Sequence, residues 1–171
     1  DIDKQVMLAL NGSESLYMDG VMKIYTTTSV WIPVAVVLLF IVIKNNTPRN
    51  TLLIILGVAL TIFLTDKVSS DIIKPLVGRL RPSHDPEMMH LIDTFNGYRS
   101  GSYSFTSSHA CNSFGIFVFI SLLIKNRTLS LTLLLWALIN SFSRIYLGVH
   151  YPGDILCGSI VGSLLGFIVY M

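Results

Sequence analysis

The chain has 171 residues, of which 52% are hydrophobic and only 13% are charged, and its mean hydropathy is +0.66. Soluble domains carry about 25% charged residues, so this composition excludes an ordinary soluble domain and indicates a membrane protein of one domain. A net charge of +2 is too small to favour nucleic-acid binding, and the sequence contains no nucleic-acid-binding motif.

The first twenty residues begin with acids, and their apolar runs are short and interrupted, unlike a signal peptide. The apolar residues of this segment recur at helical spacing: Ile2, Val6, Met7 and Leu10. We therefore expect residues 1–20 to form an amphipathic helix that lies at the membrane surface.

Five apolar stretches follow, each with about 20 residues, which is enough for a helix to cross the hydrocarbon layer. The sequence thus predicts an all-α integral membrane protein, a bundle of about five transmembrane helices. The predicted spans are residues 21–44, 51–74, 105–124, 128–146 and 152–171.

The loops predict the orientation of these spans. Residues 44–50 and 125–128 hold four basic residues and no acid, so the positive-inside rule places them in the cytoplasm. With five spans, the segment 1–20 and the long loop 75–104 then lie outside, and the chain ends inside.

Polar residues gather where the spans meet the outer side. Lys67, Asp71 and Lys74 are spaced four and three apart, so they share a helix face and can neutralise each other. Pro75 is expected to end this helix or to begin a turn. Because spans alternate in direction, one side of the membrane collects Lys74, Arg81, His109, Arg144, His150 and Asp154.

Solvation among the lipid headgroups explains any single cation at such a boundary, and it explains Arg79 at least as well as a functional role does. Six ionisable residues on four helix ends, including two histidines, favour a site instead. In the fifth span, Asp154 begins a stripe of small residues with four-residue spacing that continues through Gly158, Gly162 and Gly166. Such stripes let helices approach closely, so Asp154 is predicted to face the bundle and not the lipid.

These residue types suit phosphate chemistry. Cationic side chains, a serine hydroxyl and a helix N-terminus all bind phosphate oxygens. Of two histidines, one can attack phosphorus while the other protonates the leaving oxygen. Asp154 lies four residues after His150 and can hold one imidazole nitrogen protonated, which frees the other nitrogen for attack.

We therefore predict His150 as the nucleophile and His109 as the general acid, with no metal and no cofactor. A metal bound by His109, His150 and Asp154 is the alternative, and the nearby cations oppose it.

His84 and His90 fit ordinary loop residues, with a substrate or lid role as the alternative. Cys111 and Cys157 fit buried free thiols, and a disulfide stays open if their helices are adjacent.

Three segments carry a resemblance to a known family: KPLVGRLRP (74–82), TSSH (106–109) and SRIYLGVHYPGD (143–154). They resemble the motifs of the type 2 phosphatidic acid phosphatases. These motifs are Lys, six residues, Arg-Pro; then Pro-Ser-Gly-His; then Ser-Arg, five residues, His, three residues, Asp. In the second motif Thr106 replaces proline and Ser108 replaces glycine, which can alter the phosphate pocket. Backbone donation by Ser108 survives this change if its φ is negative.

The resemblance implies a metal-independent phosphatase that works through a phosphohistidine at His150. It implies His109 as the acid and Asp154 as the residue that orients His150. It implies five phosphate binders: Lys74, Arg81, Ser107, Ser108 and Arg144. Residues 1–171 then form a single membrane-embedded phosphatase domain, with residues 75–104 as its extracytoplasmic active-site loop. The family usually has six spans, whereas this chain has five predicted spans and the amphipathic segment.

A site at the bilayer boundary suits the phosphate headgroup of a membrane lipid. We expect a multi-pass protein of the bacterial inner membrane whose site faces the periplasm or the cell exterior and which needs no obligatory protein partner. The candidate substrates are lipid A phosphate, undecaprenyl diphosphate, phosphatidylglycerol phosphate and phosphatidic acid. Compact members of the family include lipid A phosphatases and phosphatidylglycerol phosphate phosphatases. The loop is expected to touch lipid through Met88, Met89, Leu91 and Ile92.

Two other functions remain open at this stage. The same motifs serve phosphotransferases, which would pass the phosphate to a second lipid. A catalytically silent lipid-binding membrane protein is the alternative outside enzymes.

Overall fold

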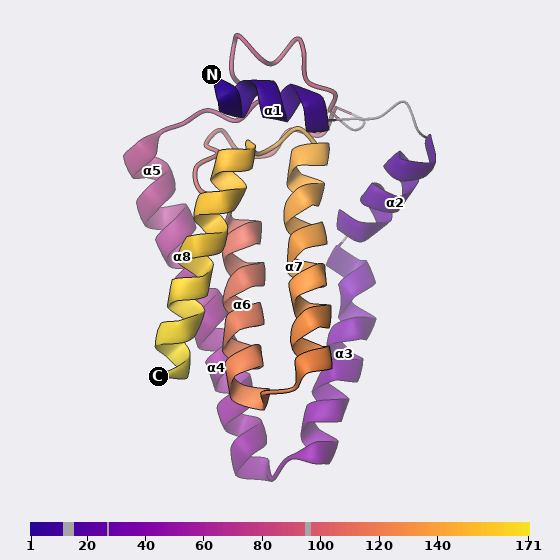
Figure 1. The fold of residues 1–171 in the computed structure, drawn as a ribbon, viewed down its shortest axis with the longest axis vertical. Helices are drawn as coiled ribbons and strands as arrows, with labels where there is room; N and C mark the ends of the chain where they lie inside the picture. Colours follow the sequence, from indigo (N-terminus) through magenta and orange to yellow (C-terminus); the bar gives the residue numbers. More distant parts are fainter. Residues whose placement is uncertain (12–15, 27, 95–96) are drawn as a thin grey trace.

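The computed structural model describes residues 1–11, 16–26, 28–94 and 97–171, which form helices and loops with one isolated antiparallel bridge between Leu80 and Tyr103. Figure 1 shows an elongated bundle, with a short helix α1 (Ile2–Leu10) lying across one end of it. The other elements are α2 (Leu16–Thr26), α3 (Thr28–Asn45), α4 (Pro48–Asp66), the π-helical turn η1 (Lys67–Ile73), α5 (Lys74–Val77), α6 (Ser108–Ile124), α7 (Arg127–Tyr146) and α8 (Pro152–Tyr170).

The predicted all-helical membrane bundle is confirmed. Among the described residues, three stretches are long and apolar enough to cross a membrane: Pro48–Val77, Arg127–Tyr146 and Pro152–Tyr170. The bent pair formed by α2 and α3 is a fourth if it counts as one span, with an angle of 51° between its parts. The predicted third span is the apolar helix α6, which has 17 residues and runs between α7 and α8 in Figure 1.

The N-terminal segment differs from the single helix predicted over residues 1–20. Helix α1 ends at Leu10, and α2 begins at Leu16, before the predicted start of the first span. The reason lies in Asn11, whose side chain donates to the carbonyl oxygens of Asp93, Ile145 and Tyr146 at 3.0–3.2 Å. These contacts fix the end of α1 against the bundle.

The second span continues past Pro75 to Val77, so of the two predicted alternatives this proline does not end the helix and instead lies in the first turn of α5. The amide of Lys74 donates to the carbonyl oxygen of Ser69, five residues back, which is the bond of a π-helical turn. Pro75 therefore lies in the first turn of α5, where the missing N–H of proline removes no hydrogen bond from the helix. The helix ends at Gly78, whose φ of +62° favours glycine.

The same π-helical turn changes how the polar residues face. Lys67 and Asp71 form an exposed ion pair of 2.6 Å, as expected. Lys74 does not join them, because the wider turn rotates it away, and its ammonium donates to Ser108 Oγ at 2.8 Å. The prediction that all three residues neutralise each other is thus wrong for Lys74.

Helices α6 and α8 pack with their backbones in close contact. The buried residues of α8 are Asp154, Gly158, Gly162 and Gly166, the stripe seen in the sequence. A Cβ atom at Gly162 would lie 2.1 Å from the carbonyl oxygen of Cys111, so only glycine fits there. Asp154 consequently faces the bundle, as predicted. Both Cys111 and Cys157 are free thiols.

Helix α4 meets α6 through threonines. Thr61 and Thr65 are fully buried, and their methyl groups lie opposite Gly115 of α6. Their hydroxyls donate to carbonyl oxygens one turn back, and Thr65 also donates to Asn112 Oδ1 at 2.6 Å. Small and hydroxylated side chains at this interface provide close packing and hydrogen bonds within the membrane.

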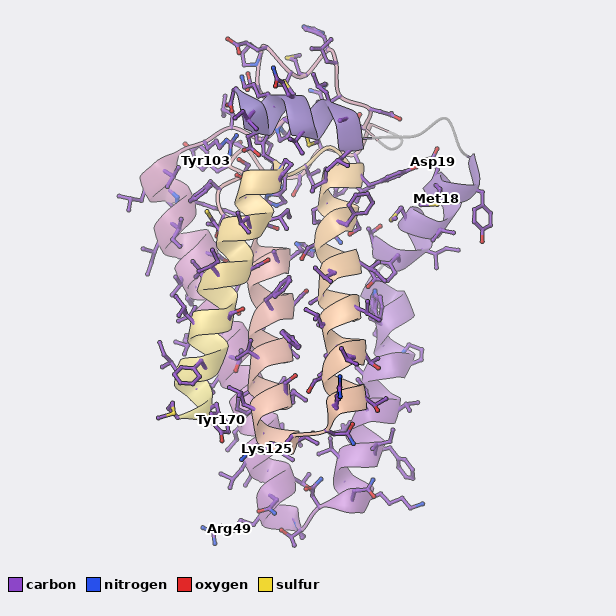
Figure 2. All side chains as sticks on the ribbon, in the orientation of Figure 1. Met18, Asp19, Arg49, Tyr103, Lys125 and Tyr170 are labelled. Atoms are coloured by element: carbon purple, nitrogen blue, oxygen red, sulfur yellow. The ribbon has the colours of Figure 1, made fainter. Side chains whose placement is uncertain are left out.

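The end of the bundle under α1 has a small apolar core. It is formed by Met7, Met88, Ile92, Ile145 and Tyr151. Two loop residues expected to touch lipid, Met88 and Ile92, are therefore buried beneath α1, because the loop folds back onto this helix. Leu91 of the same loop is exposed. The basic loops lie at the far end of the bundle, where Figure 2 labels Arg49 and Lys125.

The contact between α6 and α8 can be tested at Gly162. We expect Gly162→Ala to lower the free energy of unfolding by roughly 1–3 kcal/mol, because the new methyl group overlaps the backbone of α6. Gly20→Ala is the matched control, since Gly20 is also helical and has open space around it. Equal thermal stability of the two variants in detergent would contradict this packing.

Candidate active site

Four helix ends meet beneath α1 and bring the predicted residues together. Lys74 comes from the start of α5, Ser107 and Ser108 from the start of α6, and Arg144 from the end of α7. The α7–α8 connection supplies His150, and the first turn of α8 supplies Asp154. Apart from Lys74 and His109, all the predicted site residues are buried.

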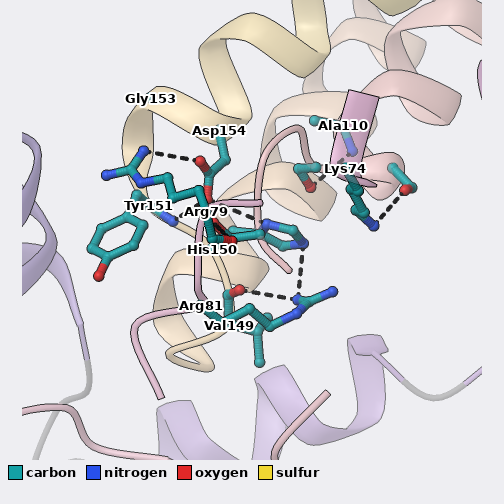
Figure 3. Close-up of polar contacts among 12 residues, drawn as sticks. Lys74, Arg79, Arg81, Ala110, Val149, His150, Tyr151, Gly153 and Asp154 are labelled. Atoms are coloured by element: carbon teal, nitrogen blue, oxygen red, sulfur yellow. Dashed lines mark hydrogen bonds and ion pairs between the residues drawn. The ribbon is translucent and has the colours of Figure 1, made fainter. Parts of the chain in front are cut away.

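His150 lies between a carboxylate and a guanidinium, as Figure 3 shows. Arg81 Nη1 lies 3.1 Å from His150 Nε2, and a guanidinium can only donate, so Nε2 must accept with its lone pair. The proton of the neutral ring is then on Nδ1. The reactive lone pair of His150 thus points toward the cations.

Asp154 lies behind the imidazole. Its Oδ2 is 3.5 Å from His150 Nδ1, which is longer than an ordinary hydrogen bond, and Nδ1 has no hydrogen-bond partner within the described ranges. The carboxylate therefore acts on the ring through its charge at this distance. Such contacts often shorten when substrate binds. The amide of Tyr151 donates to the same Oδ2 at 2.9 Å, which fixes the carboxylate at the start of α8.

Two arginines have donors that remain unused. Nε of Arg81 and Nε of Arg144 are buried and have no hydrogen-bond partner in the part of the chain that the structure describes. Unpaired buried donors cost free energy, and the groups that best compensate positive donors are anionic oxygens. The two side chains are 6% exposed, so an anion bound here would be largely removed from water.

The start of α6 supplies further donors. The amides of Ser108 and His109 belong to the first turn, so they have no partner inside the helix. Ser108 has helical backbone with negative φ, so serine causes no strain in place of the family's glycine. Its hydroxyl accepts from Lys74 and also contacts the hydroxyl of Ser70 at 2.9 Å.

Ser107 has a structural position in this turn. Its hydroxyl caps α6 by accepting from the amide of Ala110, and its own amide donates to the carbonyl oxygen of Asp154 at 3.2 Å. Ser107 therefore ties the start of α6 to the start of α8. A direct contact between Ser107 and phosphate stays a prediction.

His109 differs from the other site residues because its side chain is exposed. It lies within electrostatic range of Arg144, His150 and Lys74. It is therefore close to the cations and open to an approaching headgroup. This is the position that a proton donor to a leaving group needs, and its role as the acid stays a prediction.

Sequence reasoning missed a cluster around Asp154. Arg79 Nη1 donates to Asp154 Oδ1 at 3.0 Å, and Arg79 Nη2 contacts Asp3 Oδ2 of α1 at 2.7 Å. The guanidinium also lies 3.9 Å above the centre of the Tyr151 ring. The clue in the sequence is the position of Arg79, two residues before Arg81, where alternate residues of an extended segment share a side.

The comparisons with known proteins agree with these motifs. Residues 50–171 match the PAP2 superfamily. The chain belongs to this superfamily. It is 41% identical to a lipid A 4'-phosphatase of Bacteroides thetaiotaomicron over 99% of this chain and 76% of that protein. It is 31% identical to a lipid A 4'-phosphatase of Porphyromonas gingivalis over 99% of this chain and 72% of that protein.

A similar fold is also found among solved structures. The crystal structure of Aquifex aeolicus LpxE superposes with a TM-score of 0.70 and 22% sequence identity, covering 96% of this chain and 92% of that chain. At this identity the likeness shows the fold alone. Membership of the superfamily rests on the sequence matches, and the matched residues 50–171 include the candidate site residues.

The burial of His150 predicts a pH dependence of stability. Burial lowers the pKa of its imidazole to about 4, although Asp154 acts in the opposite direction. Between the usual value of 6.5 and about 4, the unfolded chain binds a proton here that the folded chain does not. Stability should therefore fall as the pH is lowered through this window.

Unfolding of the wild type and of His150→Asn, measured above pH 6.5 and near pH 4, tests this expectation. The variant should lose less stability at low pH than the wild type. The same loss in both proteins would show that His150 is not the residue responsible.

Proposed function

We propose that this chain is a metal-independent lipid phosphate phosphatase that works through a phosphohistidine at His150. The observation that carries the proposal is the environment of His150: its Nε2 faces Arg81 at 3.1 Å, and Asp154 lies behind Nδ1. A neutral imidazole held this way presents a lone pair beside an anion-binding group. Membership of the PAP2 superfamily supports the same assignment.

The first step forms a bond between phosphorus and His150 Nε2. The lipid phosphate would draw Arg81 away from Nε2 and onto its own oxygens, which frees the lone pair for attack. As the N–P bond forms, the ester P–O bond breaks, and protonated His109 gives its proton to the leaving oxygen. The imidazole of His150 gains a positive charge, which the Asp154 carboxylate stabilises.

The second step returns the enzyme to its starting state. Water attacks phosphorus, His109 takes one of its protons, and the N–P bond breaks. Inorganic phosphate leaves, and His150 recovers its lone pair while His109 is protonated again. The two steps together consume one water molecule.

The donors around His150 would stabilise the charge on the transferred phosphoryl group. Arg81 and Arg144 have unused buried donors, and the first amides of α6 face no partner within their helix. Lys74 and Ser108 form a hydrogen-bonded pair next to them. Donors fixed in this way need no reorganisation when negative charge develops, which favours the transition state.

The preferred substrate of this proposal is the 4'-phosphate of lipid A. Both relatives described above carry the name lipid A 4'-phosphatase and align with almost the whole chain. The site lies at one end of an apolar bundle, so acyl chains can stay in the bilayer while the phosphate reaches the cations (Figure 1). The basic loops at the opposite end support an orientation in which the site faces the periplasm.

Release of phosphate from defined lipids tests the function. We expect detergent-purified protein to release phosphate from lipid A in excess EDTA, and faster than from undecaprenyl diphosphate, phosphatidylglycerol phosphate or phosphatidic acid. His150→Ala should abolish release, because the nucleophile is lost. His90→Ala is the matched control, since His90 is an exposed loop histidine.

Several outcomes would count against the proposal. Loss of activity in EDTA would show that the reaction needs a metal. Full activity of His150→Ala would show that His150 is not the nucleophile. A phosphorylated second lipid among the products, with little free phosphate, would identify a phosphotransferase instead.

The role of His109 can be separated from that of His150. In His109→Ala, an aryl phosphate should still phosphorylate His150, because its leaving group needs little protonation. Hydrolysis of the intermediate should then be slow, since no base activates water. We expect phosphorylated His150 to accumulate, measured by mass spectrometry after a rapid alkaline quench. No accumulation, with turnover equal to that of wild type, would contradict the assignment of His109.

A further inference from the structure

The carboxylate of Asp154 is shared among three groups, one from the long loop and two from the α7–α8 connection. Its Oδ1 accepts from Arg79 Nη1 at 3.0 Å, and its Oδ2 accepts from the Tyr151 amide at 2.9 Å while facing His150 Nδ1 at 3.5 Å. Asp154 is fully buried. A buried carboxylate needs such partners to remain charged.

These contacts also fix how the carboxylate is turned. With Oδ1 bound by Arg79, the group cannot rotate about its Cβ–Cγ bond without breaking a charge-assisted hydrogen bond. Oδ2 is therefore kept on the side of His150, as Figure 3 shows. The direction of the charge felt by the imidazole thus depends on Arg79.

Arg79 is itself held from two further sides. Its Nη2 pairs with Asp3 of α1 at 2.7 Å, and its guanidinium stacks on the ring of Tyr151 at 3.9 Å. Two of the five N–H donors of Arg79 are engaged by the carboxylates of Asp154 and Asp3, and these negative charges disfavour a phosphate next to the guanidinium. Its position favours an action on Asp154.

Helix α1 contacts the groups around Asp154 through two of its side chains, those of Asp3 and Lys4. Asp3 accepts from the Gly153 amide through Oδ1 at 2.8 Å, so it contacts the start of α8 as well as Arg79. The next residue, Lys4, pairs with Asp85, and Asp85 in turn accepts from the hydroxyl of Tyr151 at 2.9 Å. Two adjacent residues of opposite charge therefore attach α1 to the groups around Asp154.

We infer that Arg79 is a positioning residue, which holds the Asp154 carboxylate toward His150, and that Asp3 of α1 anchors Arg79 in this orientation. The inference rests on the proposed function, since it assigns Arg79 a part in the reaction of His150. It makes α1 part of the catalytic unit, although none of the proposed phosphate binders lies on α1.

Kinetics of Arg79→Ala test the inference. We expect kcat to fall roughly 10- to 100-fold, the size of the loss that is typical when the partners that orient metal-binding histidines are removed. The inhibition constant of inorganic phosphate should not change, because Arg81 and Arg144 remain. Arg79→Lys should recover part of kcat, since the ammonium keeps a positive charge near Asp154 but lacks the planar fork with which arginine spans the two carboxylates.

Matched controls exclude general effects of charge or folding. Arg49→Ala removes an arginine at the opposite end of the bundle (Figure 2), and Glu87→Ala removes an exposed acid that pairs with Lys4 and not with Arg79. Both should keep the kcat of wild type. Thermal unfolding of each variant measures whether it is folded.

A double-mutant cycle tests the role of Asp3. Asp3→Ala alone should lower kcat less than Arg79→Ala does. In the Arg79→Ala background, the same substitution should lower kcat by a smaller factor than it does in the wild type. An equal fall in kcat in both backgrounds would show that Asp3 acts independently of Arg79, and would overturn its role as the anchor.

Two results would overturn the role of Arg79 while leaving the proposed function intact. One is an unchanged kcat in Arg79→Ala while His150→Ala is inactive. The other is a raised inhibition constant for phosphate, which would make Arg79 a phosphate ligand. Full activity of His150→Ala in the same assay would instead contradict the proposed function. Failure of the role of Arg79 and failure of the proposed function therefore give different results.

Discussion

The buried charge of Asp154 is the constraint on which the rest of the site depends. A carboxylate removed from water is stable only if cations and amides surround it, and here these come from the long loop and the α7–α8 connection. Each partner has a second contact: Arg79 with α1, and His150 with Arg81. One ionised group therefore determines where the nucleophile and its neighbours lie.

The close packing of α6 on α8 makes this arrangement possible. The glycines of α8 let the two backbones meet, and this brings the amide of Ser107 within 3.2 Å of the Asp154 carbonyl oxygen. The first turn of α6, in which the amides of Ser108 and His109 have no partner inside the helix, is thereby held beside the carboxylate and the histidine. Within the membrane such packing replaces the hydrophobic driving force that joins helices in water.

The sequence predicted the helices and the meeting of the motif residues well, because apolar length and the alternation of spans decide both. It did not predict the π-helical turn before Pro75, since this depends on a hydrogen bond between Lys74 and Ser69 that no residue pattern encodes. It also left Arg79 as a solvated cation, and assigned Met88 and Ile92 to lipid. Those residues are buried by α1, and a contact between segments so distant along the chain is not visible in local spacing.

The most direct test of this mechanism is a structure with vanadate bound. We expect a bond from vanadium to His150 Nε2, with Arg81 moved off this nitrogen and onto the equatorial oxygens together with Arg144. We also expect Asp154 to move closer to Nδ1 than its present 3.5 Å while it keeps its contact with Arg79. Vanadate bonded to another residue, or Arg81 still seated on Nε2, would contradict the central role given to His150.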